Sequence, residues 1–143
     1  MAKPNDEALS LLRIVWELDH RLQSQSKRMR ARTGVTGPQR LVLRMLLVAP
    51  DAAPSAIARS LFFDRSTVTV ILRGLERANL VRRAPNATDR RAITLALTSK
   101  GRRIAEQQTG TIESLFRRAV ARLDKREVKA ARRVLEEIAR ELV

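Results

Sequence analysis

Ten cationic and three acidic side chains lie between Asp64 and Arg103, the stretch of the chain best suited to bind another molecule. Their net charge of +7 is half of the formal +14 of the whole chain. Charge this concentrated indicates a polyanionic partner such as DNA, RNA or an anionic surface, because it defines a local electrostatic footprint. The alternative is a solvated charged face without a partner.

Residues 65–78 predict a helix that begins after Asp64, a good N-cap residue. Val68, Leu72 and Leu75 recur at spacings of four and three and should face a core. The other side chains supply candidate DNA contacts: Ser66, Thr67, Thr69, Val70, Arg73 and Arg77. Short hydroxyl side chains allow close approach to a groove, and arginine reaches guanine edges or phosphates. Capping of the helix is an alternative role for the first two hydroxyl groups, and both roles are compatible.

Residues 80–84 and 92–97 have the apolar and β-branched composition of strands, and residues 85–89 have turn chemistry. An antiparallel hairpin is therefore expected, with Asp89, Arg90 and Arg91 in its loop. An arginine at a hairpin tip can enter a narrow minor groove. Asp89 would orient a neighbouring guanidinium through a bidentate pair. The alternative is a surface ion pair contributing about 0–1 kcal/mol.

The composition of the 143-residue chain predicts one domain with an aliphatic, mainly helical core, since only 3% of the residues are aromatic. Phe62 and Phe63 are expected to pack in that core. The chain has no cysteine, and its one histidine, His20, lies opposite the apolar stripe of its helix, so no metal site is expected. P-loops, glycine-rich cradles and nucleophile elbows are also missing, which argues against an enzyme and against a cofactor.

The remaining segments predict helices that hold this basic unit. One runs from about residue 5 to Arg30, with Gly34 ending it; a T-x-x-Q capping box at Thr36 opens the next. Pro54 opens a third helix, giving a helix-turn-helix layout. A helix capped by Thr98 is expected to continue past Gly110 to about residue 123, before a final helix that begins at Asp124.

Apolar stripes in the first and last helices exceed what one small lobe needs to bury, and strict 3-4 spacing favours pairing with a second copy. The expected organisation is a single domain, 1–143, with a DNA-binding lobe over 34–101 and dimerisation helices over 5–33 and 102–143. With neither a signal-type N-terminus nor an apolar run of membrane length, the chain is expected to be cytoplasmic.

Four motifs in order resemble the MarR family of bacterial winged-helix regulators: T-x-x-Q, DRSTVT, LERANLVRR and DRRAITLALTSKG. The resemblance spans nearly the whole chain. It implies a mainly α fold: a winged helix-turn-helix with a two-stranded β-wing, plus a dimerisation lobe from the terminal helices. Two positions depart from the family pattern: Val70 stands where a basic residue is common, and Asn79 replaces a usual glycine.

The resemblance implies a dimeric regulator, typically a repressor, that reads a pseudo-palindromic operator through residues 65–78 and the wing at 80–97. Arg91 would be the minor-groove arginine, with Asp89 holding it. Such regulators are commonly released by small aromatic or phenolic ligands, for which Arg13, Trp16 and Met45 are candidate neighbours; the competing role of Trp16 is as core of the dimerisation lobe. The alternative function is a winged-helix module for RNA or protein without an effector.

Overall fold

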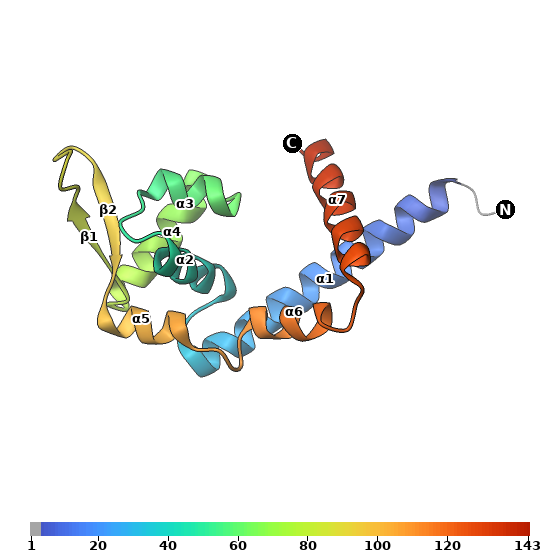
Figure 1. Ribbon diagram of the computed structural model, residues 1–143, viewed down its shortest axis with the longest axis horizontal. Coiled ribbons are helices and arrows are strands. Elements are labelled where there is room, and N and C mark those ends of the chain that lie inside the picture. The colour runs from blue at the N-terminus through green and yellow to red at the C-terminus, as the bar shows by residue number, and fades with distance from the viewer. Residues whose placement is uncertain (1–3) are drawn as a thin grey trace. The chain divides into compact units, whose positions relative to one another are not determined.

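The computed structural model describes residues 4–143, and side chains from Glu7 onward. The chain divides into two compact units, Met1–Gln107 and Gln108–Val143, and each is described by itself. The first unit contains α1 (Pro4–Thr33), α2 (Gly37–Val48), α3 (Pro54–Leu61), α4 (Arg65–Arg77), β1 (Val81–Pro85), β2 (Ile93–Leu97) and α5 (Ser99–Glu106); the second contains α6 (Ile112–Val120) and α7 (Lys125–Glu141). This order confirms a mainly helical winged helix-turn-helix fold (Figure 1).

The predicted helix ends of the first unit are confirmed. Gly34 has a left-handed φ of 79°, and its N–H donates to the Arg30 carbonyl at 2.8 Å, which ends α1. At the start of α2, Thr36 Oγ1 accepts from the Gln39 N–H at 3.3 Å, while the Thr36 N–H donates to Gln39 Oε1 at 2.9 Å. This reciprocal capping box satisfies two backbone donors that a helix N-terminus leaves unpaired.

The core of the first unit is aliphatic, as the composition predicts. Its buried residues come from α2, α3, α4, the strands and α5, together with Val35 and Leu80 from the connecting segments. They are Val35, Val42, Leu43, Leu46, Ile57, Ala58, Val68, Ile71, Leu72, Leu75, Leu80, Val81, Leu95 and Ala105. Phe63 packs against this cluster, as expected. Phe62 does not: its side chain is 95% exposed, so the prediction of a core position for it is wrong.

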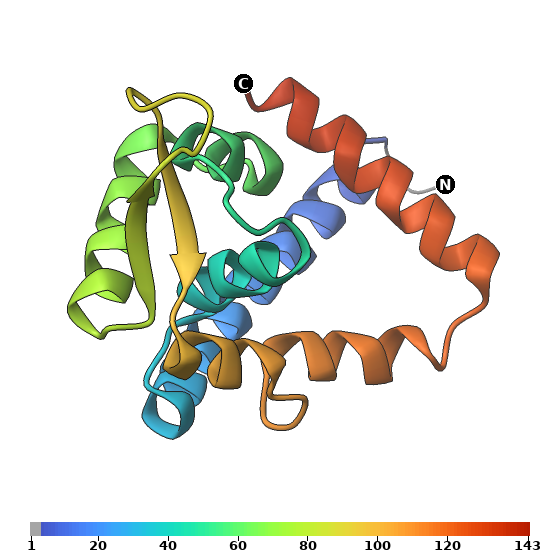
Figure 2. The same cartoon turned by 60° about the vertical axis from the view of Figure 1, so that its left-hand side comes forward.

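The strands form an antiparallel hairpin in which Val81 pairs with Leu97 and Arg83 with Leu95. Pro85, expected in the turn, is the last residue of β1 and pairs with Ile93, so the loop covers residues 86–92. The Leu95 N–H donates to the Ala52 carbonyl at 3.1 Å, which ties β2 to the loop before α3. The wing therefore runs alongside the helix-turn-helix rather than standing free of it (Figure 2).

Close backbone contact joins the start of α5 to the end of α4. Thr98 Oγ1 donates to the Asn79 carbonyl at 2.7 Å and accepts from the Gly101 N–H at 3.0 Å. A Cβ on Gly101 would lie 1.9 Å from the Leu80 carbonyl oxygen, so only glycine allows this approach. Asn79 has φ of 56°, the left-handed conformation that asparagine tolerates well.

The expected continuous helix from Thr98 to residue 123 is wrong. α5 ends at Glu106, Gly110 adopts a left-handed φ of 70°, and Thr111 caps a new helix by accepting from the Ser114 N–H at 3.3 Å. Glycine and a capping hydroxyl in succession favour a break because both stabilise non-helical backbone. The chain therefore changes from its first unit to its second at this break.

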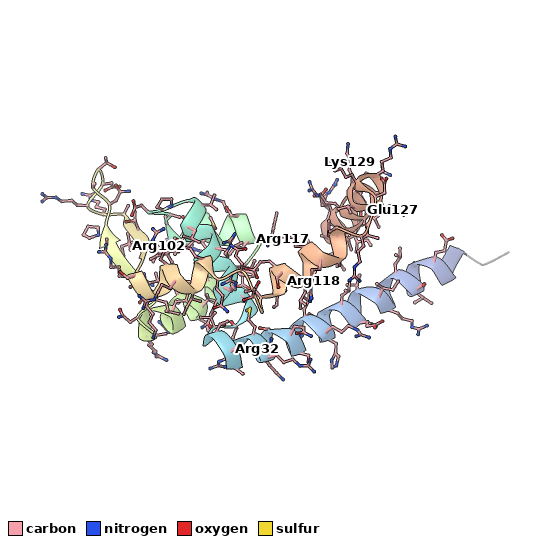
Figure 3. The ribbon with its side chains drawn as sticks, turned by 60° about the horizontal axis from the view of Figure 1, so that its bottom comes forward. Arg32, Arg102, Arg117, Arg118, Glu127 and Lys129 are labelled. Atoms are coloured by element: carbon pink, nitrogen blue, oxygen red, sulfur yellow. The ribbon has the colours of Figure 1, made fainter. Side chains whose placement is uncertain are left out.

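In the second unit, α7 begins with a capping box of Asp124 and Glu127, at the predicted residue. Cationic side chains are frequent here, including Arg117 and Arg118 on α6 and Lys129 on α7 (Figure 3). Neither helix contains a buried residue. The apolar stripe of α7 is therefore exposed to solvent: Leu135 is 50% exposed, and Leu142, the C-cap residue, is 80% exposed.

Candidate nucleic-acid interface

α4 carries its candidate contact residues on one exposed face and its core residues on the other. Val68, Leu72 and Leu75 are at most 2% exposed, which fixes the rotation of the helix about its axis. The six predicted contact side chains are all exposed: Ser66, Thr67, Thr69, Val70, Arg73 and Arg77. Among the described residues, neither arginine of this set forms an ion pair, so both guanidinium groups are available to a partner.

The hydroxyl groups of this face are already engaged within the helix. Ser66 Oγ donates to Asp64 Oδ1 at 2.7 Å, and Thr69 Oγ1 donates to the Arg65 carbonyl at 2.9 Å. The Thr67 N–H also donates to Asp64 Oδ1, at 2.7 Å. Two of the predicted hydroxyl contacts thus offer acceptor oxygens and carbon atoms to a partner rather than hydrogen-bond donors, and Ser66 takes part in the cap.

Asp64 is the acid that holds the first turn of α4. Hydrogen bonds from the Thr67 backbone and from the Ser66 hydroxyl lower the pKa of its carboxyl below the ordinary value, because they stabilise the ionised form. Asp64 is therefore ionised at neutral pH. Its negative charge faces the positive end of the helix dipole and offsets part of the local positive potential.

The wing loop exposes Asp89, Arg90 and Arg91, as predicted. Asp89 acts differently from the expectation: its Oδ1 accepts from the backbone N–H of Arg91 at 3.0 Å, and no ion pair between Asp89 and an arginine occurs in the described part of the chain. The Asn86 side chain also accepts from the Thr88 N–H at 2.8 Å. These bonds shape the loop backbone and leave the Arg90 and Arg91 guanidinium groups in solvent.

An ion pair that sequence reasoning did not identify links the wing to α4. Arg83 Nε lies 2.6 Å from Glu76 Oε1, with side chains 39% and 31% exposed. The two residues are seven positions apart and lie on different elements, so no local spacing rule marks them as partners. This pair removes Arg83 from the set of cations available to a ligand, whereas Arg82 remains exposed.

Arg40 and Arg44 form a second arrangement that the sequence did not reveal. Arg40 is 2% exposed, and its guanidinium donates to the carbonyls of Ile104, Ala105 and Gln107. Arg44 Nη1 donates to the Ala105 carbonyl at 3.1 Å. Cations are favourable partners for the carbonyls at this negative end of a helix, so α2 holds the end of α5.

The candidate effector residues are only partly brought together. Arg13 and Trp16 both line a shallow groove along α1, and the Trp16 side chain is 65% exposed. Met45 lies on α2, packs against the core of the first unit and does not line this groove. Within residues 4–143, no group of three potential metal ligands occurs, and none of the helices is long and apolar enough to cross a membrane.

Comparison with known proteins adds independent information on this fold. Residues 33–92 match a model of the MarR family. The HTH-type transcriptional repressor Rv2887 of Mycobacterium tuberculosis is 29% identical over 105 residues, which cover 73% of this chain and 76% of the relative. The HTH-type transcriptional repressor MdtR of Bacillus subtilis is 28% identical over 96% of this chain and 89% of its own length.

Solved structures show the same architecture. A MepR–DNA complex of S. aureus superposes with a TM-score of 0.77 at 23% identity, covering 91% of this chain and 96% of the other. The residues that match the family model, 33–92, contain α2, α3, α4, β1 and the wing loop. In its ordered motifs, its fold and these relatives, the chain is similar to the MarR family of winged helix-turn-helix transcriptional regulators.

Proposed function

We propose that this protein is a repressor that binds a pseudo-palindromic DNA operator as a homodimer. α4 would enter the major groove and the wing loop the neighbouring minor groove. The observation that carries the proposal is the placement of exposed, unpaired arginines on both elements of one compact unit: Arg73 and Arg77 on α4, and Arg90 and Arg91 in the loop. The similar proteins Rv2887 and MdtR are both named transcriptional repressors, which supports repression rather than activation.

The bonding of the α4 hydroxyl groups supports a particular division of roles. Since Ser66 and Thr69 donate inward, phosphate binding falls to the arginines and to backbone N–H groups. Val70 is 69% exposed beside Thr69, so this part of the helix offers carbon atoms to the groove. Thymine presents a methyl group there, and we infer a preference for thymine opposite these two residues.

The wing supports the minor-groove role through its backbone. Asp89 accepts from the Arg91 N–H and thereby holds the loop, while the Arg91 side chain stays in solvent. A guanidinium inserted in a narrow minor groove benefits from the enhanced negative potential there. Asp89 is thus proposed as a positioning residue and Arg91 as the groove contact.

Arg91→Ala tests this assignment. We expect affinity for a duplex selected by the wild type from a randomised library to fall about tenfold, and the slope of log K against log salt to shrink by about 0.9 for each lost phosphate contact. Fluorescence anisotropy over a salt series measures both. Arg118→Ala, which removes an exposed arginine of α6, is the matched control and should bind as the wild type does.

Two outcomes would contradict the proposal. Failure to select any duplex with two-fold symmetry would remove the operator function. Stronger binding to a double-stranded RNA competitor than to duplex DNA would favour the alternative RNA module.

We also propose that a small aromatic or phenolic acid releases the operator. The exposed indole of Trp16 beside Arg13 in the α1 groove supports an aromatic anion as ligand, since the pair offers a stacking face and a cation. In a thermal-shift screen of aromatic acids, a ligand should raise the melting temperature and weaken DNA binding. A screen in which no acid shifts the melting temperature would contradict this part.

A further inference from the structure

Phe62 occupies an unusual position in the turn between α3 and α4. Its side chain is 95% exposed, and its backbone has φ of 54° and ψ of 34°. Bulky side chains rarely adopt this left-handed conformation, which glycine adopts without cost. The residue therefore combines two unfavourable features, a strained backbone and a large apolar surface in water, that core packing does not explain.

The surroundings of Phe62 are cationic. Together with Ser55, Ala58, Phe63 and Asp64, it lines a shallow surface groove that Arg59 and Arg65 border. Both arginines are exposed, and in the described part of the chain neither forms an ion pair. Asp64 is the one acid of the groove, and its Oδ1 accepts from the Thr67 N–H and the Ser66 hydroxyl of α4.

We propose that Phe62 is a further DNA-contact residue whose ring packs on a deoxyribose at the edge of the major groove, while Arg59 and Arg65 bind the flanking phosphates. The inference rests on the proposed function, because it places the turn beside the duplex that α4 enters. Phe62 is two residues before Asp64, the N-cap of α4, so at most about 7 Å of chain separates it from that cap.

The chemistry of the groove fits a nucleic-acid backbone better than a protein surface. A DNA strand alternates an apolar sugar with an anionic phosphate, and this patch combines an exposed apolar ring with two cations. The patch is also continuous with the exposed face of α4, since Arg65 is the first residue of that helix and borders the groove. A ring on a sugar carries no base information, so this contact would add affinity and fix the register of α4.

The variant Phe62→Gly tests the contact with DNA without disturbing the fold. Glycine relieves the left-handed strain, so the melting temperature should stay unchanged or rise. We expect the affinity for the duplex selected by the wild type to fall about three- to tenfold with an unchanged salt slope, because the lost contact is apolar. Arg59→Ala should also weaken binding, but with a slope smaller by about 0.9.

Val48→Ala is the matched control, because Val48 is an exposed apolar residue at the end of α2, 83% exposed and distant in sequence from the turn. This variant should keep the wild-type affinity. Hydroxyl-radical footprinting adds a direct readout, since the radical cleaves at exposed deoxyribose. The wild type should protect sugars at the edges of each half-site. In the complex of Phe62→Gly, these sugars should become cleavable while the rest of the footprint is unchanged.

An equal affinity and an equal footprint for Phe62→Gly and wild type would overturn the inference and leave the proposed function intact. The same result would follow if the ring docked a protein partner, because binding to naked DNA would then be insensitive to it. A wild-type protein without salt-dependent duplex binding would instead contradict the proposed function itself.

Discussion

Asp64 combines a structural role with a position inside the candidate interface. Its carboxylate accepts from the Thr67 N–H and the Ser66 hydroxyl, and these bonds lower its pKa. A group whose pKa is lower in the folded state stabilises that state at pH values above its unfolded pKa, about 3.9 for aspartate. The contribution disappears as the pH falls through the still lower folded pKa.

We therefore expect Asp64→Ala to lower the melting temperature at pH 7 by a few degrees, because the first turn of α4 loses its cap. The gap to the wild type should narrow below about pH 4, as the carboxyl of the wild type becomes protonated. Circular dichroism melts across this range measure the gap. Asp64→Ser, which retains a capping oxygen, should stay close to the wild type, and a gap that is constant down to pH 2 would contradict the assignment.

At the scale of elements, α5 is held at both of its ends. Its first turn approaches the Leu80 backbone at Gly101, and its last carbonyls accept from the buried Arg40. Since α5 connects the wing to the second unit along the chain, these contacts fix where the wing ends. The L-x-L-T-x-x-G motif is thus explained by packing: threonine caps the helix, and glycine allows the close backbone approach.

Gly101→Ala should destabilise the first unit by about 2 kcal/mol, because the new Cβ would overlap the Leu80 carbonyl and force the backbone apart. Urea unfolding followed by circular dichroism measures the change. Gly74→Ala is the control: its Cβ would meet the flexible end of the Gln39 side chain at 2.7 Å, and its effect should remain within about 1 kcal/mol. Equal effects of the two variants would contradict this account.

At the scale of the whole molecule, exposed apolar stripes on α1 and α7 determine how the protein can associate. On α1, Leu11 and Leu18 are 43% and 44% exposed, and on α7 Leu135 is 50% exposed. Large apolar side chains repeated at helical spacing on two elements favour association, because burying them removes apolar surface from water. A homodimer is the proposal that the stripes support, and two copies of α4 would then read two half-sites.

Leu135→Glu should shift the protein from dimer to monomer at micromolar concentration and lower its affinity for the selected duplex. Size-exclusion chromatography with light scattering gives the mass. Arg133→Gln changes the charge by the same amount about 200° around α7 and should remain dimeric. Far-UV circular dichroism checks that both variants keep their helices, and a wild-type protein that is monomeric at this concentration would contradict the dimer.

Local rules predicted most of the elements and the orientation of the candidate site. The Thr36 capping box, the Asp64 cap and the left-handed Asn79 all lie within a few residues of the backbone groups that they serve. Periodicity placed Val68 in the core, and the opposite face of the same helix then had to be exposed. The assignment of that face to DNA contact remains a prediction.

Local sequence rules were less successful where one segment favours two different structures. The apolar stripe from Ile104 to Leu123 suggested one helix, whereas Gly110 and Thr111 break it. The expected ion pair of Asp89 is also absent among the described residues, because a carboxylate in a loop can either pair with a guanidinium or accept from a nearby backbone N–H, as Asp89 does. The choice depends on the loop conformation, which short-range spacing does not specify.

The sequence alone determined the basic unit, its helix caps and the alternation of core and exposed residues, because each depends on chemistry repeated over a few positions. Only the tertiary structure decided that Phe62 faces solvent, that Arg83 pairs with Glu76, and that Arg40 is buried against the end of α5. Phenylalanine is usually buried because it is hydrophobic, and arginine is usually exposed because it is charged. Both preferences are reversed here because the backbone of the turn directs Phe62 into solvent and the carbonyls at the end of α5 accept hydrogen bonds from Arg40.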